Sequence, residues 1–236
     1  MKSAGQSASR PPGRSDARFP AARILPVVLG LAVMLVTLVV PAGCGDSPTA
    51  PDQEAGQSPL QQCLARAVFG DPANSQYILP FPVGASYPLL QTYCGPQNHG
   101  NGNQLAWDFT VPFGDPVIAS RAGTVRVVVD TYADDDQIGS HNNHIFIEHA
   151  DGTTALYAHL VRDSATVHVG DGVAQGQLIA LSGTSGAPVE VLHFAVYRTW
   201  PNREGDDVPV SFRNADGPLD ERGGLVQGET YTALPW

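Results

Sequence analysis

Short runs of β-favouring residues, separated by turn residues, dominate the chain from about residue 61 onward. These runs are rich in Val, Ile and Tyr, and they alternate with segments that contain Gly, Pro and Asp; they include GTVRVVVDTY, HIFIEHA, TTALYAHL and VEVLHFAVYR. Asp151-Gly152 stands between two runs, which is a strong hairpin signal. Helical periodicity is limited to residues 61–68. The pattern predicts one all-β domain over residues 61–236, in which the tail forms a closing strand pair.

The charge of the chain is divided unevenly along its length. Residues 1–43 carry five basic residues and one acidic residue, a net charge of +4, whereas the remainder carries eight Arg and no Lys against 22 acidic residues, a net charge of −14. A body this acidic repels the phosphate backbone of DNA or RNA. The sequence therefore excludes nucleic acid as a partner.

The amino-terminal segment has the features of an export signal. A basic region precedes a 17-residue apolar run, Ile24 to Val40, and the small residues Ala42-Gly43 follow it. This order of basic, apolar and small residues is typical of a signal peptide, here covering residues 1–43. A permanent membrane helix is the alternative, but the run is slightly short to span a bilayer and contains helix-weakening Pro and Gly residues.

The end of this segment, Ala-Gly-Cys, resembles a bacterial lipobox. In that motif the Cys is lipidated and becomes the first residue of the mature protein. The resemblance implies an acyl anchor on Cys44 that holds the domain at a membrane of the cell envelope, on the periplasmic or outer face. Residues 44–60 are rich in Pro, Ser, Gly and Gln without an apolar period, and they are expected to form a flexible tether.

Two further cysteines, Cys63 and Cys94, remain once Cys44 is assigned to the lipid. In an oxidising envelope these two residues are expected to form a disulfide. A bridge across this 31-residue separation would stabilise the domain by about 3–4 kcal/mol in the chain-entropy model. Two separate buried thiols are the alternative.

The chain has seven histidines, all in the exported part: His99, His141, His144, His149, His159, His168 and His193. A hydrolytic zinc site takes three protein ligands from His and carboxylate groups and leaves a fourth position for water. In VEVLHFAV, strand alternation places His193 on one face with Val191 and Ala195. Small apolar neighbours suit a buried ligand, although a core His that binds nothing is the alternative.

From about Ile78 to Arg198 the sequence resembles the LytM/lysostaphin-type zinc peptidases, which cut peptidoglycan cross-links. The pieces that carry the resemblance occur in order as NHGNGNQLAWDFTVPFGDPVIASRAGTVRV, IEHADGTTALYAHL, HVGDGVAQGQLIALSGTSG and VLHFAVYR. The resemblance implies antiparallel β-sheets in a barrel-sandwich hybrid. It also implies one zinc ion bound by His99, Asp108 and His193.

His99 is assigned by a longer-spacer variant of the family pattern, because Gln104 occupies the position four residues before Asp108. A solvated loop His is the alternative for His99. The resemblance further implies that His159, in the motif YAHL, positions the attacking water and stabilises the tetrahedral oxyanion.

The strand VLHF departs from the family pattern HxHF at its first position. Val191 stands where the family has a histidine that transfers a proton, and the loss of such a group typically costs 10²–10⁴-fold in rate. The neighbouring Glu190 is expected to face the opposite side of the strand. His141 or His144 can compensate only if it reaches the site; otherwise both are solvated loop residues.

Two functions are compatible with these residues. The first is an envelope lipoprotein with zinc-dependent endopeptidase activity on peptidoglycan peptides, supported by the three retained ligands and His159. The second is a catalytically impaired module that binds peptidoglycan or activates a cell-wall hydrolase, supported by Val191. We favour the enzyme, because three ligands and an open position already form a minimal hydrolytic centre.

Overall fold

The computed structural model describes residues 57–95, 99, 103–202 and 205–236. The predicted export signal, the lipidation site Cys44 and most of the predicted tether lie outside the described residues. Within the described part of the chain, no helix combines the length and the apolar character that spanning a bilayer requires.

The described chain begins with a short capped helix, α1 (Pro59–Arg66). The Ser58 side chain accepts a hydrogen bond from the Gln61 backbone, and the Gln61 side chain accepts one from the Ser58 backbone, at 3.2 and 2.8 Å. This capping box and Pro59 in the first turn fix the start of the helix. The helix therefore begins two residues before the segment with helical periodicity, inside the range predicted as a tether.

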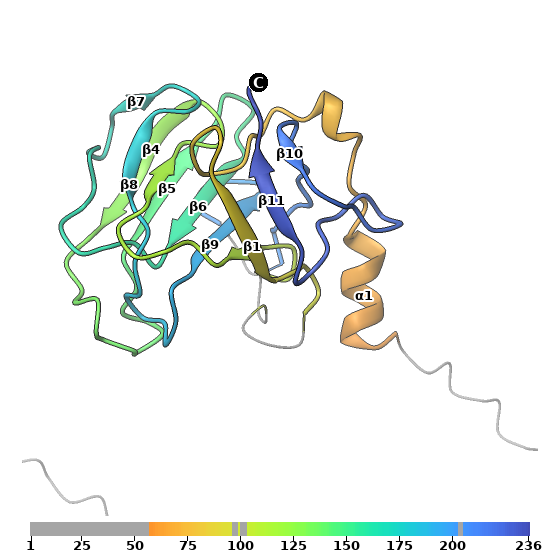
Figure 1. Cartoon of the computed structure of the whole chain (residues 1–236), viewed down its shortest axis with the longest axis horizontal. Helices are drawn as coiled ribbons and strands as arrows, with labels where there is room; N and C mark the ends of the chain where they lie inside the picture. The colour runs from red at the N-terminus through yellow and green to blue at the C-terminus, as the bar shows by residue number, and fades with distance from the viewer. Residues whose placement is uncertain (1–56, 96–98, 100–102, 203–204) are drawn as a thin grey trace, which may run out of the picture. The chain divides into compact units, whose positions relative to one another are not determined.

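The remainder of the described chain is built from a 3₁₀ turn, η1 (Pro72–Asn74), and short antiparallel strands. One sheet has nine strands in the order β10-β11-β1-β2-β9-β6-β5-β4-β7, and β3 pairs with β8 in a second sheet (Figure 1). The predicted all-β class is confirmed. The strands are β1 (Ser86–Gln91), β2 (Trp107–Phe109), β3 (Pro116–Ile118), β4 (Gly123–Val129), β5 (His144–Glu148), β6 (Thr154–Ala158), β7 (Gly172–Val173), β8 (Leu178–Leu181), β9 (Leu192–Tyr197), β10 (Ala215–Asp216) and β11 (Thr230–Ala233).

Two of the expected local features are present. The hairpin predicted at Asp151-Gly152 joins β5 to β6, and Gly152 has a φ of 84°, which glycine adopts at no steric cost. The predicted strand pair in the tail is the pairing of β10 with β11, which continues onto β1.

The centre of the large sheet is buried on both faces. Every residue of β6 and β9 is buried, which explains why neither strand shows a simple apolar–polar alternation. Aromatic side chains fill the core beside them, including Trp107, Phe109, Phe194 and Phe212, each at most 2% exposed. Residues placed on β2, β9 and the end of β6 are therefore held by a closely packed support.

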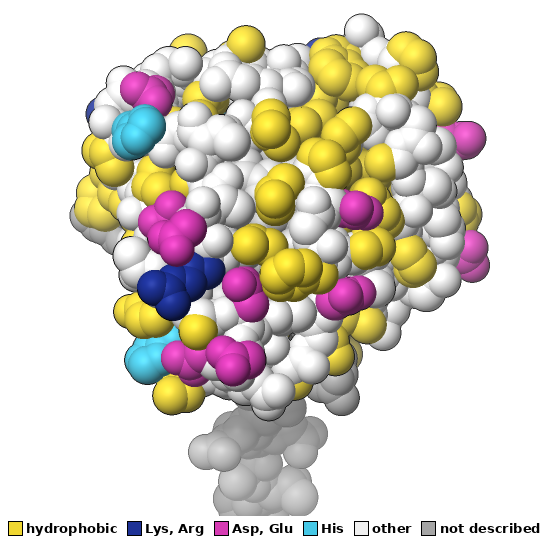
Figure 2. Space-filling view, turned by 60° about the vertical axis from the view of Figure 1, so that its left-hand side comes forward, with side chains coloured by type: hydrophobic (Ala, Val, Ile, Leu, Met, Phe, Trp, Pro, Cys, Tyr) yellow, Lys and Arg dark blue, Asp and Glu magenta, His cyan; other side chains and the backbone are white. Residues whose placement is uncertain are grey.

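A disulfide between Cys63 and Cys94 links α1 to the segment that follows β1, with an S–S distance of 1.98 Å. The bridge places the helix beside the chain that leads to His99. On the surface, acidic side chains are scattered over the face shown in Figure 2 and few basic ones accompany them, in keeping with the negative net charge of the chain.

Candidate metal centre

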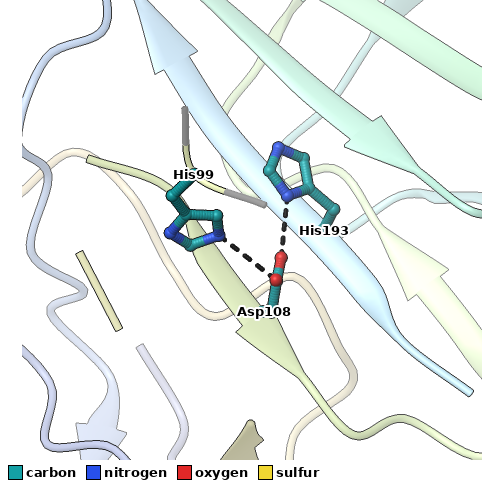
Figure 3. Close-up of side chains that lie close together, drawn as sticks. All are labelled: His99, Asp108 and His193. Carbon is teal, nitrogen blue, oxygen red and sulfur yellow. Dashed lines mark hydrogen bonds and ion pairs between the residues drawn. The ribbon is translucent and has the colours of Figure 1, made fainter. Parts of the chain in front are cut away.

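Asp108 and His193 face each other across two neighbouring strands. They are Cα partners in the antiparallel register of β2 and β9, and His193 Nδ1 lies 2.7 Å from Asp108 Oδ1. His99 Nε2 approaches the other carboxylate oxygen, Asp108 Oδ2, at 3.1 Å (Figure 3). The three side chains come from different parts of the sequence and converge on one carboxylate.

These three side chains form a donor set that suits a divalent cation. One ligand atom from each of His99, Asp108 and His193 lies within 4.8 Å of the others, and the residues are 2%, 8% and 7% exposed. Two imidazole nitrogens and a carboxylate oxygen are ligands that zinc accepts. The far nitrogens, His99 Nδ1 and His193 Nε2, are buried and have no hydrogen-bond partner among the described residues, so the hydrogen bonds that these two rings make there run to Asp108.

The charge of Asp108 is held by the two histidines. Burial raises the pKa of this carboxyl, but His193 first and His99 second oppose burial and together hold the pKa well below its ordinary value. Asp108 is therefore ionised at neutral pH, which is the state that a metal ligand requires.

Gln104 occupies the position four residues before Asp108 and does not join this donor set. Its side-chain oxygen instead accepts a hydrogen bond of 3.0 Å from Arg66 of α1. His99, nine residues before Asp108, supplies the third donor.

His159 follows the last residue of β6 and lies next to the donor set. Its neighbour Ala158 is the Cα partner of His193, and the rings of His159 and His193 have centroids 6.2 Å apart. His159 has a φ of 66°, an uncommon value for a residue other than glycine, and such strained positions gather at functional sites. The turn directs this imidazole toward the cleft instead of along the strand.

The imidazole of His159 is oriented by the chain. Its Nδ1 donates a hydrogen bond of 2.8 Å to the Ser185 carbonyl, which leaves Nε2 for a substrate or a water. Burial lowers the pKa of His159, so the ring is neutral at pH 7. A neutral, oriented imidazole can accept a proton or, once protonated, stabilise an oxyanion.

A cleft of about 750 Å³ opens onto Asp108, His159 and His193, which are the ionisable side chains among the described residues that line it. No Lys or Arg belongs to this described lining. Five carboxamide side chains line it instead: Gln91, Asn103, Gln137, Asn142 and Gln227. Sequence reasoning missed these residues, because they come from separate loops and strand ends and form no motif.

Val191 forms part of the wall of this cleft, directly before β9, and is 5% exposed. An aliphatic side chain thus occupies the place where the family pattern has a proton-transferring His. Glu190 is exposed and is not among the described residues that line the cleft.

His141 and His144 are engaged outside the described lining of the cleft. His141 Nδ1 lies 2.7 Å from Asp136 Oδ2, and its ring stacks on Tyr132 at 4.7 Å. His144 Nδ1 contacts the backbone and side-chain oxygens of Asn142 at 3.0 and 2.9 Å. Neither ring takes the place of the missing histidine in this structure.

The comparisons with known proteins agree with this site. Residues 102–208 match the model of Peptidase family M23. The matched segment contains Asp108, His159 and His193, whereas His99 lies just before its start. This match, over 107 of the 236 residues, confirms the resemblance to LytM/lysostaphin-type peptidases for this segment.

Among individual proteins, the chain is 32% identical over 118 residues to an uncharacterized lipoprotein, YgeR, of Escherichia coli (strain K12). The match covers 49% of this chain and 44% of that relative, so this chain spans less than half the length of the relative.

Similar solved structures include an M23 protein and a zinc-containing peptidase. A mutant catalytic domain of the prophage-encoded M23 protein EnpA from Enterococcus faecalis is 25% identical, with 55% of this chain and 92% of that chain covered and a TM-score of 0.43. A zinc-containing peptidase from Vibrio cholerae is 27% identical, with 61% and 41% covered and a TM-score of 0.37.

Proposed function

We propose that the protein is a zinc-dependent endopeptidase that hydrolyses peptide bonds in peptidoglycan cross-links. The observation that carries this proposal is the convergence of one ligand atom each from His99, Asp108 and His193 within 4.8 Å of one another, beside a cleft that Asp108 and His193 line. The M23 assignment of residues 102–208 supports the same reaction class.

His99, Asp108 and His193 would hold one zinc ion, and the bound ion would supply a polarised carbonyl and a water with a pKa near 7. The chain contributes the remaining groups. Asp108 supplies a permanent negative charge. His159, held by the Ser185 carbonyl, would accept a proton from the attacking water on its unprotonated Nε2, and the resulting N–H would donate to the oxygen that becomes negative.

The lining of the cleft suits a peptide substrate. Carboxamide side chains both donate and accept hydrogen bonds, as peptide groups do, and they carry no charge. A peptide can therefore pair its backbone N–H and C=O groups with Gln137 and Gln227, and with the lone pairs and N–H groups that Asn103 and Asn142 do not already use, without a charged partner. Peptidoglycan peptides present backbone N–H and C=O groups of this kind.

The location that we propose is the cell envelope, with Cys44 carrying a lipid that tethers the domain to a membrane. Support comes from the lipobox-like sequence before Cys44 and from the lipoprotein nature of the relative in Escherichia coli. Peptidoglycan is within reach of a protein anchored there.

The test uses the full chain, purified in detergent and supplied with zinc. We expect about one zinc ion per chain by elemental analysis and release of peptides from purified peptidoglycan by mass spectrometry. His193→Ala is expected to abolish both, whereas His168→Ala, whose side chain is 89% exposed, should change neither. The absence of bound zinc from the unaltered protein would overturn the proposal.

A second candidate function rests on Val191. Without a proton-transferring side chain at this position, the domain would bind peptidoglycan or activate a cell-wall hydrolase without cutting bonds itself. Release of peptides by Val191→His, combined with no release by the unaltered protein, would favour this second function over the first.

A further inference from the structure

The loop that carries His99 is tied to helix α1 at both of its ends. We propose that α1, through the Cys63–Cys94 disulfide and Arg66, positions His99 and thereby sets the metal affinity of the site. The inference rests on the proposed metal site, and it adds positioning residues that do not touch the metal or the substrate.

The first end of the loop is held at Cys94. The disulfide joins Cys94 to Cys63, a residue of α1 that is 2% exposed. The backbone N–H of Cys94 also donates a hydrogen bond of 2.6 Å to the Gln104 carbonyl. This bond joins the two ends of the loop to each other, so fixing one end restrains the other.

The second end of the loop is held by Arg66, in the last turn of α1. Its Nη2 donates to Gln104 Oε1 at 3.0 Å, and its Nη1 donates to Asp207 Oδ1 at 2.9 Å. The other oxygen of Asp207 accepts the Leu105 N–H at 2.7 Å. The carboxylate of Asp207 is fully buried, and Arg66 supplies the positive charge that pairs with it. The contact from Arg66 through Asp207 to Leu105 therefore depends on Arg66.

Asn103, which directly precedes Gln104, is restrained as well. Its side-chain oxygen accepts a hydrogen bond from the hydroxyl of Tyr197, at the end of β9. Three consecutive residues, 103–105, are thus each fixed by a different partner. Tyr197 belongs to the same strand as His193, and Leu105 lies two residues before β2. The end of the loop is therefore held in a fixed position relative to β2 and β9, the two strands that carry the other proposed ligands.

The physical consequence concerns entropy. Only eight residues separate Cys94 from Asn103, and His99 lies among them. With Cys94 and residues 103–105 fixed, fewer positions are open to His99 before a metal binds, and metal binding has less conformational entropy to remove. We call the Cys63–Cys94 disulfide and the contacts of Arg66 the clamp. Without the clamp, metal binding itself has to restrict His99, and the apparent affinity for the metal decreases.

The clamp also makes the metal site depend on the redox state of the compartment. Forming the Cys63–Cys94 bond releases two protons and two electrons, which a disulfide-exchanging oxidant accepts. Such oxidants act in the envelope and not in a reducing cytosol. The site therefore reaches its full affinity only after the pair has been oxidised.

The experiment measures zinc affinity of the full chain by competition with a chromogenic chelator. The variants are Cys63→Ser/Cys94→Ser, Arg66→Ala and Arg66→Lys. Serine is chosen because free thiols would themselves bind zinc. We expect Kd to rise on the order of tenfold or more in the first two variants, and Arg66→Lys to restore part of the loss.

The matched control is Arg126→Ala, which removes an Arg–carboxylate pair with Glu148 between β4 and β5 and should leave Kd unchanged. Circular dichroism and Tm establish that each variant is folded; should the double serine variant fail to fold, the Arg66 pair carries the test. A second readout is the visible spectrum of the Co²⁺ form, which should change when His99 is no longer held.

An unchanged zinc Kd and an unchanged Co²⁺ spectrum in folded Arg66→Ala would overturn the inference. Failure of the unaltered protein to bind zinc is a different outcome, because it would overturn the proposed function itself.

Discussion

Asp108 of β2 stands directly opposite His193 of β9, and this register pair brings a carboxylate oxygen and an imidazole nitrogen to 2.7 Å from each other across 85 residues of sequence. Both strands lie inside the nine-stranded sheet, so the backbone of neither residue can shift without disturbing the pairing of its strand. The third residue of the proposed site, His99, reaches the same carboxylate from outside the strands. The proposed site thus combines two residues on paired strands with one that the chain must hold in place by other means.

The first prediction concerns the charge of Asp108. Asp108→Asn keeps the size of the side chain but removes the negative charge that two histidines stabilise. We expect zinc affinity to fall by at least about 100-fold, because a neutral amide is a poor ligand for zinc. Competition with a chelator measures the change, and an affinity within tenfold of the unaltered protein would exclude Asp108 as a ligand.

The second prediction separates catalysis from metal binding. His159→Gln should reduce the rate of peptide release by about 10²–10⁴-fold, because an oriented imidazole is lost. Zinc content should remain at the level of the unaltered protein, since His159 is not one of the three donors. His168→Gln serves as the control for removing a histidine at the surface. Loss of zinc from His159→Gln would contradict the assigned role.

The third prediction addresses the aliphatic wall of the cleft. Val191→His places an imidazole on the same strand face as His193, and the rate of hydrolysis should rise by about 10-fold or more. Val191 is buried, so the larger side chain should also lower the free energy of unfolding by about 1–3 kcal/mol. Kinetics and denaturant unfolding test the two effects separately. A rate that does not change would show that this position takes no part in proton transfer.

The fourth prediction concerns the pH dependence of stability. Burial lowers the pKa of His149 to about 4, and its Nδ1 donates a hydrogen bond of 2.9 Å to the Ala122 carbonyl. Because the unfolded chain has a His pKa of about 6.5, it binds the proton first as the pH falls. Stability is therefore complete above about pH 6.5 and is lost as the pH decreases toward 4.

The variant His149→Asn keeps a donor for Ala122 but does not titrate. Between pH 6.5 and pH 4 the free energy of unfolding should decrease in both proteins. The decrease in the variant should be smaller than that in the unaltered protein by up to about 3 kcal/mol. The slope that remains belongs to partly buried histidines, such as His144 and His159, whose pKa values desolvation also lowers. Equal slopes in urea unfolding at several pH values would refute this role of His149.

The fifth prediction concerns the charge of the substrate. Because no Lys or Arg is among the described residues that line the cleft, a peptide whose side-chain carboxylates are amidated should be cut about fivefold faster than the same peptide with free carboxylates. Gln227→Lys adds a positive charge at an exposed position of the lining and should reduce this preference. The preference should also weaken at high salt. Equal rates for the two peptides would show that the lining does not select on charge.

The sequence by itself determined the local elements and most of the residues of the candidate site. The turn at Asp151-Gly152 follows from the backbone freedom of glycine, and the strands on either side follow from their β-branched and aromatic residues. Asp108, His159 and His193 were found because each lies in a short motif of the matched family. Such features depend on residues that are neighbours in the chain.

Only the tertiary structure decided how these residues meet. The strand order β2-β9-β6 sets Asp108 beside His193. It also places His159 directly after Ala158, the residue of β6 that pairs with His193. No local preference of the chain specifies this order. The same is true of the clamp from Arg66 to Gln104 and Asp207, and of the cleft, whose described lining has no Lys or Arg. Contacts of this kind join segments 38 to 141 residues apart, and they form only when the packing of the whole domain offsets the entropy of bringing such segments together.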